Sequence, residues 1–287
     1  MTTGNRIGTS AQIDLRTQLD EDVLARVEHA LDVQLDRGKQ VRKRRSVGTP
    51  TDRGTWVRIE VRRREKITGQ GFNGAEAAAV LTGIAMPAWH AGMSWNDPER
   101  GVMWRADETD LITAASIKPG GILTNDPQLT PQWWAGLNDS LDSLARAETT
   151  RVATLHTVAI TQERVSGEIG KVFGADLDTT VHSWVAAHAD FAWPNLTAPE
   201  FWILDWEDWG QAPRGLDAAM LWSNSLAVPG LAEQVRRVRQ ADLDSRDGQL
   251  MMLFFAAGIL GAPADYSGPL LEPARRVASE LIPLLRS

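Results

Sequence analysis

The sequence contains no cysteine, a single tyrosine and no long hydrophobic run. Without cysteine, the chain can form no disulfide and no thiolate metal site, and it cannot use a thiol as a nucleophile. No apolar run reaches the roughly 20 residues that a transmembrane helix needs. Residues 1–16 also lack the hydrophobic core of a secretory signal. These absences predict a soluble, cytoplasmic protein without a membrane partner.

The charge balance is moderately acidic. The 287 residues include 37 acidic and 30 basic side chains, which gives a formal net charge of −7. This balance disfavours broad nucleic-acid binding and suits a small cationic substrate, although modest acidity also serves solubility. The chain is longer than a typical domain of about 100–200 residues, so we expect two lobes or one large domain. Nothing in the sequence indicates an oligomeric state.

The strongest motif places His188, Asp190 and Asn195 in the spacing H-x-D-x-x-x-x-N. Transfer of a γ-phosphoryl group needs a metal ion against the phosphates and a carboxylate that orients the attacking hydroxyl and accepts its proton. Asp190 can supply this carboxylate, and Asn195 can bind the metal. Pro194 forbids helix between them, so the two side chains can point into one cavity from the two ends of a loop.

A second group of residues follows this loop. The apolar residues 201–204 predict a short strand with Asp205 at its carboxyl end. Mg²⁺ prefers one or two carboxylates together with phosphate oxygens and water, so Asp205 and Asn195 form a candidate pair of ligands. The loop motif followed by an apolar run and Asp205 is more specific than H-x-D alone, which arises by chance in many chains.

These segments resemble the catalytic loop and metal-binding segment of the aminoglycoside phosphotransferases, a family of small-molecule kinases. In that family H-G-D-x-x-x-x-N is followed by a short hairpin, an apolar triplet, an aspartate and a tail that runs from a glycine to Asp-Leu-Ala. Gly210 and Asp217 occupy the tail positions here. Ala189 replaces the usual glycine of the loop, which is compatible with a negative φ at this residue.

The resemblance implies an α+β, protein-kinase-like fold with two lobes. A small β-rich lobe over residues 1–117 would bind the nucleotide, and a larger helical lobe over residues 118–287 would hold the catalytic loop and the acceptor site. The implied cofactors are Mg²⁺ and ATP or GTP. The implied roles are Asp190 as catalytic base, His188 as brace of the loop, Asn195 and Asp205 as metal ligands, and Asp217 as structural anchor.

The amino-terminal lobe matches the resembled fold less well. There, the hairpin between the first strands covers the phosphates, and we place it at residues 46–54, with Ser46 and Thr49 as candidate nucleotide-binding residues. A later strand normally carries a lysine that pairs with a glutamate of the next helix. Here Arg58 takes that position, where it could steady the phosphates, with Glu76 as its expected partner. Arginine presents a planar fork, so nucleotide binding could be weakened or rearranged.

Two further segments have open interpretations. The cations of residues 42–45 (Arg42, Lys43, Arg44 and Arg45) could touch phosphate or could be a solvated strand edge. Residues 104–115 predict strand, turn and strand before a connector, which in the resembled fold is the hinge that binds adenine. Ala115 and Ile117 would line that hinge. Apolar periodicity predicts a hairpin over residues 39–61 and helices over residues 18–34, 73–84, 130–147, 161–173, 178–189 and much of the chain after Asp217.

Three functional hypotheses follow. The first is a kinase that transfers the γ-phosphoryl group of ATP or GTP to a hydroxyl of a small acceptor, such as an aminoglycoside or another amino sugar. The second is a catalytically weak, kinase-like protein that binds or senses a ligand. The third is a metal-dependent hydrolase that uses the acidic cluster near Asp205, although such enzymes need richer ligand sets than five histidines provide. No sequence motif identifies the acceptor.

Overall fold

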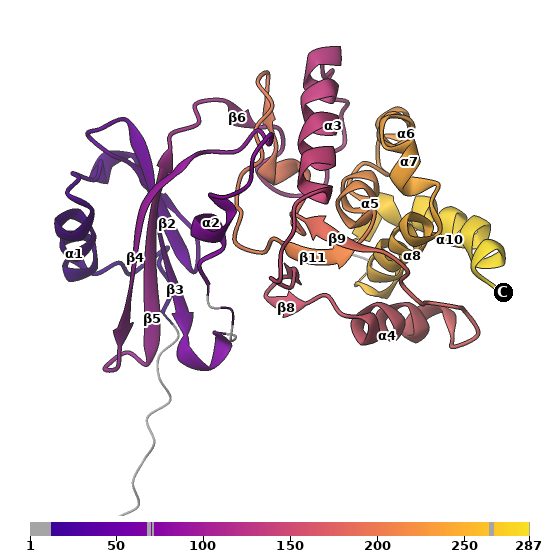
Figure 1. Cartoon of the computed structure of the whole chain (residues 1–287), viewed down its shortest axis with the longest axis horizontal. Helices are drawn as coiled ribbons and strands as arrows, with labels where there is room; N and C mark the ends of the chain where they lie inside the picture. The colour runs from indigo at the N-terminus through magenta and orange to yellow at the C-terminus, as the bar shows by residue number, and fades with distance from the viewer. Residues whose placement is uncertain (1–12, 68–69, 71, 264–266, 287) are drawn as a thin grey trace, which may run out of the picture. The chain divides into compact units, whose positions relative to one another are not determined.

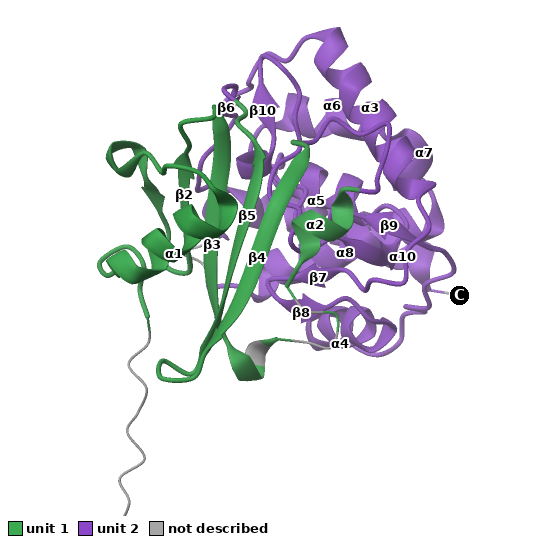
Figure 2. Cartoon of the chain, turned by 60° about the vertical axis from the view of Figure 1, so that its left-hand side comes forward, with its two compact units in different colours: residues 1–79, 87–112 green, residues 80–86, 113–287 purple. Residues whose placement is uncertain are grey.

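The computed structural model describes residues 13–67, 70, 72–263 and 267–286. The chain divides into two compact units (Figure 2): unit 1 is Met1–Ala79 with Pro87–Ile112, and unit 2 is Val80–Met86 with Thr113–Ser287. The sequence predicts one boundary after residue 117, whereas the chain passes between the units three times. Residues 1–12, part of the segment without a signal core, and residues 264–266, predicted as loop, lie outside the described residues.

Unit 1 contains an antiparallel five-stranded sheet in the order β1-β2-β3-β5-β4 (Figure 1). The predicted hairpin is confirmed, because β2 pairs with β3 across the turn at residues 51–54. Residues 104–115, predicted as strand, turn and strand, contain β5 as far as Asp110, a break at residues 111–114 and the start of β6 at Ala115. The strands are β1 (Val41–Arg42), β2 (Ser46–Pro50), β3 (Thr55–Arg63), β4 (Trp89–Asp97) and β5 (Val102–Asp110).

One face of this sheet is apolar and the other is charged. Side chains alternate across β3, so Val57, Ile59 and Val61 enter the core while the residues between them face the opposite side. Helix α1 (Glu21–Leu31) covers the apolar face, which confirms the predicted opening helix. Helix α2 (Gly74–Ala78) is much shorter than the predicted helix over residues 73–84.

Unit 2 is mainly helical, and its centre is α8, which packs against α4, α5 and α10. The predicted helices over residues 130–147 and 161–173 are confirmed as α3 and α4. Thr130 caps α3 by accepting the backbone N–H of Trp133 (3.2 Å), and Pro131 opens its first turn. The helices are α3 (Pro131–Ala145), α4 (Gln162–Phe173), α5 (Leu216–Ser223), α6 (Pro229–Val238), α7 (Gln240–Leu243), α8 (Arg246–Gly261) and α10 (Leu271–Leu285).

Short strand pairs complete unit 2. Strand β9 pairs with β11, β6 with β10, and β7 with β8, all antiparallel. In the part of the chain that the structure describes, no helix is both long and apolar enough to cross a membrane. The strands are β6 (Ala115–Ser116), β7 (Thr154–Leu155), β8 (Val158–Ala159), β9 (Trp184–Ala187), β10 (Thr197–Ala198) and β11 (Gly210–Pro213); the 3₁₀ helices are η1 (Arg37–Lys39), η2 (Arg64–Lys66), η3 (Trp193–Asn195) and η4 (Gly268–Leu270).

Two predicted elements near the motif are wrong. Residues 178–189, predicted as a helix, contain β9, because the distant segment β11 supplies its hydrogen-bonding partner. Residues 201–204, predicted as a strand, contribute only a bridge between Ile203 and Leu196. Phe201 instead packs edge-on against Trp133, with ring centroids 4.9 Å apart. Phe201 is also the side chain nearest to Gly136 of the same helix, so it packs against α3.

Candidate active site

The loop that follows β9 is anchored by Asp217 in the first turn of α5. The backbone N–H groups of His188 and Ala189 donate to its two carboxylate oxygens, at 2.7 and 2.8 Å. Burial raises the pKa of Asp217, and these hydrogen bonds oppose that shift because they favour the charged form. The geometry supports the anchoring role implied by the sequence.

We expect Asp217→Asn to destabilise the protein by about 1–3 kcal/mol, because the amide offers one acceptor to two buried N–H donors. Urea unfolding followed by tryptophan fluorescence measures this loss. The matched control is Asp244→Asn, which removes an exposed carboxylate 3.4 Å from Arg236 and should change stability by less than about 0.5 kcal/mol. Equal stability of the two variants would show that Asp217 does not anchor the loop.

The backbone at Ala189 differs from expectation. Its φ is +68°, whereas alanine in place of the family's glycine was expected to be tolerable at a negative φ. A side chain in this left-handed region costs about 1–2 kcal/mol relative to the right-handed one. Ala189 is fully buried, and its N–H bond to Asp217 holds the conformation. The loop therefore keeps the backbone shape that the family's glycine would adopt freely.

His188 connects the loop to the segment before Asp205. Its Nδ1 accepts the backbone N–H of Asp190 (3.3 Å), and its Nε2 lies 2.9 Å from the carbonyl oxygen of Leu204. The ring must therefore carry its proton on Nε2, where it donates to that carbonyl. Trp206 packs edge-on against the buried ring at 4.8 Å. His188 thus fixes the backbone on both sides without facing solvent.

Asn195 and Asp190 are directly bonded. Asn195 Nδ2 donates to the main-chain oxygen (2.9 Å) and to Oδ2 (2.8 Å) of Asp190. Both partners are acceptors, so the amide nitrogen must face Asp190 and the amide oxygen must face away. Among the described residues, no group donates to Oδ1 of either side chain. Each residue therefore keeps one oxygen for a ligand.

A backbone hydrogen bond holds the residue before Asp205 next to Asn195. The N–H of Leu204 donates to the carbonyl of Asn195 (2.8 Å), directly before Asp205. Asp205 is partly exposed and has a φ of +68°, a conformation for which Asp and Asn are enriched. Within the described ranges no three His, Asp or Glu side chains cluster around a possible metal position. An Asn–Asp pair nevertheless suits Mg²⁺, which takes its remaining ligands from phosphate and water.

Ala115 and Ile117 lie beside the end of the catalytic loop, in the same unit. Strand β6 pairs with β10, and the N–H of Ile117 donates to the carbonyl of Leu196 (2.9 Å). The Ser116 hydroxyl donates to the carbonyl of Pro194 (2.8 Å). The proposed hinge is thus brought against the loop. The N–H of Ile117 is already used, while Ala115 is exposed.

The structure does not bring the expected hairpin residues to a turn. Ser46 and Thr49 lie within β2 and are buried, and the Thr49 hydroxyl donates to the carbonyl of Asp36 (2.7 Å). The indole of Trp56 covers Gly48, where a Cβ would lie 2.1 Å from the ring. This placement does not favour a nucleotide contact by Ser46 or Thr49. The hairpin between the first two strands is the turn at residues 43–45, not residues 46–54.

The expected pair of Arg58 with Glu76 is wrong. Glu76 on α2 pairs with Arg105 of β5 (3.1 Å), and the Arg58 guanidinium lies 3.7 Å from Glu60. Burial alone would lower the pKa of Arg105, but Asp107 and then Glu76 raise it, so the guanidinium stays charged. Arg105 was missed because the pairing of β5 with β3, which places it on the charged face, is not visible in the local sequence.

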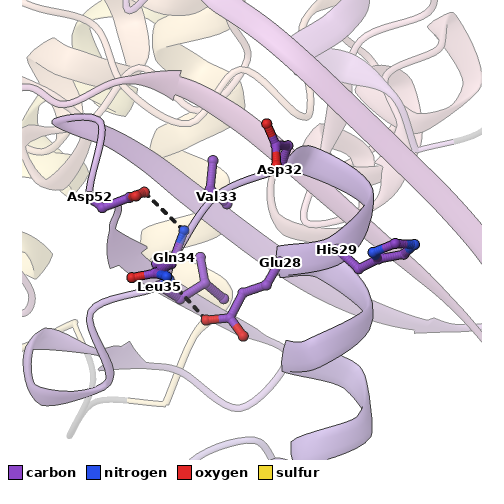
Figure 3. Close-up of a pocket in the computed structure, with 7 residues that line it drawn as sticks. All are labelled: Glu28, His29, Asp32, Val33, Gln34, Leu35 and Asp52. Carbon is purple, nitrogen blue, oxygen red and sulfur yellow. Dashed lines mark hydrogen bonds between the residues drawn. The ribbon is translucent and has the colours of Figure 1, made fainter.

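A pocket of about 560 Å³ lies at the carboxyl end of α1, and none of the predicted site residues lines it (Figure 3). Two of its three carboxylates already serve the fold: Glu28 accepts the N–H of Leu35 (3.0 Å), and Asp52 accepts that of Gln34 (2.9 Å). The remaining lining residues are His29, Asp32 and Val33.

No protein-family model and no curated protein sequence matches the chain. Solved structures match over most of its length. They include the amicoumacin kinase hAmiN in complex with AMP-PNP, Ca²⁺ and Ami (TM-score 0.55, 12% identity, 92% of this chain and 95% of that one). A thermostable mutant of aminoglycoside phosphotransferase APH(4)-Ia gives a TM-score of 0.58 at 10% identity, over 90% and 98% of the two chains.

A third match is the ternary complex of streptomycin, ATP and APH(2")-IIa, with a TM-score of 0.55 and 10% identity over 86% of this chain and 92% of that one. At such low identity these similarities establish the fold alone. The chain therefore has the α+β, protein-kinase-like fold of the aminoglycoside phosphotransferases, as its sequence motif predicts.

Proposed function

We propose that the chain is a small-molecule kinase that transfers the γ-phosphoryl group of ATP or GTP to a hydroxyl group of a small acceptor, such as an aminoglycoside or another amino sugar. The bond from Asn195 Nδ2 to Asp190 Oδ2 (2.8 Å) is the observation that carries this proposal. This bond orients the Asp190 carboxylate, which would act as a base, and the Asn195 amide oxygen, which would bind the metal. Similar structures contain AMP-PNP with Ami, or ATP with streptomycin, which supports the same class of reaction.

Asp190 would act as the catalytic base. Its Oδ2 accepts the Asn195 amide, so its Oδ1 remains to accept the proton of the acceptor hydroxyl. Its backbone is held by His188, and the backbone of the preceding Ala189 is held by Asp217. A carboxylate fixed in this way orients the hydroxyl for attack with little loss of entropy at the moment of reaction.

Asn195 and Asp205 would hold Mg²⁺ through their side-chain oxygens. The fit rests on the orientation of the Asn195 amide, whose nitrogen is occupied by Asp190. When bound there, the metal would neutralise negative charge on the transferred phosphoryl group. The backbone bond between Leu204 and Asn195 keeps the two ligand-bearing segments together.

The acceptor would be cationic. The chain has a net charge of −7, and Glu207 and Asp208 add carboxylates next to Asp205. Asp208 accepts a hydrogen bond from the Thr154 hydroxyl, so it stabilises the fold and also adds negative charge near Asp205. Glu207 is the more exposed of the pair. An amino sugar or an amino alcohol matches this field better than an anionic acceptor.

The direct test is thermal unfolding with Mg²⁺ and either ATP or GTP, followed by transfer of labelled γ-phosphate to a panel of aminoglycosides and amino alcohols. A nucleotide at about 100 times its dissociation constant should add about 2.7 kcal/mol to the folded state. No stabilisation by either nucleotide and no transfer would refute the proposal.

A second candidate is a kinase-like protein that binds a ligand without efficient transfer. The pairing of Glu76 with Arg105 favours it, because no lysine takes the usual place on β3 beside that glutamate. Nucleotide binding without transfer to any hydroxylated acceptor in the panel would support this function over the first.

A further inference from the structure

The chain that leads into the catalytic loop is held by side chains from neighbouring helices. Residues 178–183 directly precede β9 and form neither helix nor strand. The Gln162 side chain, in the first turn of α4, donates to the carbonyl of Thr179 (2.7 Å) and accepts the N–H of Val181 (2.8 Å). Backbone polar groups away from water need partners, and here helix side chains supply them.

Two consecutive residues at the start of α8 complete this support. The Arg246 guanidinium donates to two carbonyl groups within residues 178–180, at 2.7 Å each. The Asp247 carboxylate accepts the N–H of His182 (3.0 Å) through Oδ1 and that of Ser183 (2.7 Å) through Oδ2. Asp247 is only 5% exposed, so water cannot easily replace it as the acceptor.

Asp247 and Asp217 hold the two ends of the same strand. Asp217 accepts two consecutive N–H groups where β9 enters the catalytic loop, and Asp247 accepts two consecutive N–H groups just before β9 begins. The two carboxylates lie in the first turns of α5 and α8. The starts of these helices touch, because a Cβ on Gly215 would lie 2.9 Å from the Cα of Gly248. One packed frame therefore fixes β9 at both ends.

Strand pairing alone gives β9 limited support. The strand has four residues, and in the part of the chain that the structure describes it pairs only with β11. An isolated pair of short strands is marginally stable. Asp190 follows shortly after β9, so a shift of the strand would move its carboxylate. A displacement of about 1 Å at a reacting group can cost on the order of 100-fold in rate.

We propose that Asp247 is a positioning residue for the catalytic base. Asp247 and Arg246, which we call the α8 clamp, fix the entry to β9 and thereby the position of Asp190. This inference rests on the kinase function proposed above. Among the described residues, the hydrogen bonds of Asp247 reach only the backbone of His182 and Ser183. Asp247 therefore acts through the strand and touches no reacting group.

The test compares the wild type with Asp247→Asn, which places an amide donor opposite one of the two backbone donors. At a temperature at which both proteins are folded, kcat should fall at least about tenfold, while the nucleotide dissociation constant changes less than about threefold. Nucleotide binding is spared because the bond between Leu204 and Asn195 joins the metal-binding segments separately. Hydrogen exchange of the His188 and Ala189 amides, at the far end of β9, should become faster.

The matched control is Ala274→Gly, which removes a fully buried methyl group from α10 and weakens that helix. It should lower the melting temperature and leave kcat and the exchange of the His188 and Ala189 amides unchanged. Arg246→Gln is a milder second variant, because it removes only the bonds to the two carbonyl groups. It should lower kcat at least about threefold and decides the matter if Asp247→Asn does not fold.

A lower melting temperature with a wild-type kcat, in Asp247→Asn or in Arg246→Gln when it stands in, would refute the α8 clamp and leave the kinase proposal standing. An equal loss of kcat in Ala274→Gly would refute the clamp as well. If the wild type neither binds nucleotide nor transfers phosphate, the kinase proposal fails. Amide exchange then decides alone: faster exchange in Asp247→Asn keeps the clamp, and unchanged exchange refutes it.

Discussion

Asp190→Asn is expected to lower the rate of phosphoryl transfer by about 10²–10⁴-fold, the usual contribution of a positioned general base. The loop should stay intact, because an asparagine oxygen can still accept the amide of Asn195, which now donates to Asp190 Oδ2 at 2.8 Å. Nucleotide affinity should therefore change little while kcat falls. Single-turnover transfer of labelled γ-phosphate to the best acceptor of the panel measures the effect.

The control for this variant is Asp176→Asn, which removes one exposed carboxylate of the same unit and changes the net charge equally. It should transfer phosphate at the wild-type rate. If Asp190→Asn kept more than a tenth of the wild-type rate, Asp190 would not be the base, because its proton-accepting group would be gone without consequence.

Asp205→Asn is expected to remove the Mg²⁺-dependent part of nucleotide binding. At a nucleotide concentration of about 100 times the wild-type dissociation constant, most of the roughly 2.7 kcal/mol of stabilisation should disappear. The unliganded variant should melt close to the wild type, because asparagine tolerates the positive φ of +68° as well as aspartate does. Melting curves with ATP, with and without Mg²⁺, separate the two effects.

Glu200→Gln is the control here, since it neutralises an exposed carboxylate in the same unit. It should keep the full Mg²⁺-dependent increase in melting temperature. A similar increase in Asp205→Asn would show that Asp205 is not a metal ligand and would leave Asn195 without its proposed partner.

The sequence predicts best those site residues that lie close together along the chain. His188, Asp190 and Asn195 lie within one loop, so their spacing already constrains which side chains can meet, and the structure bonds Asn195 to Asp190. The anchoring position of Asp217 followed from the family pattern. The metal-binding and catalytic roles of these residues stay predictions until they are measured.

The errors arise where distant segments decide the local structure. Residues 184–187 form a strand only because β11 pairs with them, so the helical periodicity of residues 178–189 was misleading. Glu76 forms its ion pair with Arg105 rather than with Arg58, because the register of β5 against β3 places Arg105 on the charged face of the sheet. The turn at residues 43–45 was likewise not predicted, because the two residues of β1 are too few to show the alternating pattern of a strand.

The return of Val80–Met86 to unit 2 has a consequence for how the protein can be divided. Ala85 accepts the N–H of Ile203 (2.8 Å) and donates its own N–H to the Ser140 hydroxyl (3.1 Å). A fragment that ends at Ile112 would carry this segment without its partners, and a fragment that starts at Thr113 would lack it. A cut between the units would therefore remove a support of the chain just before Asp205. Exchange of the sheet unit between proteins of this fold should preserve the proposed metal binding only if residues 80–86 stay with the helical unit.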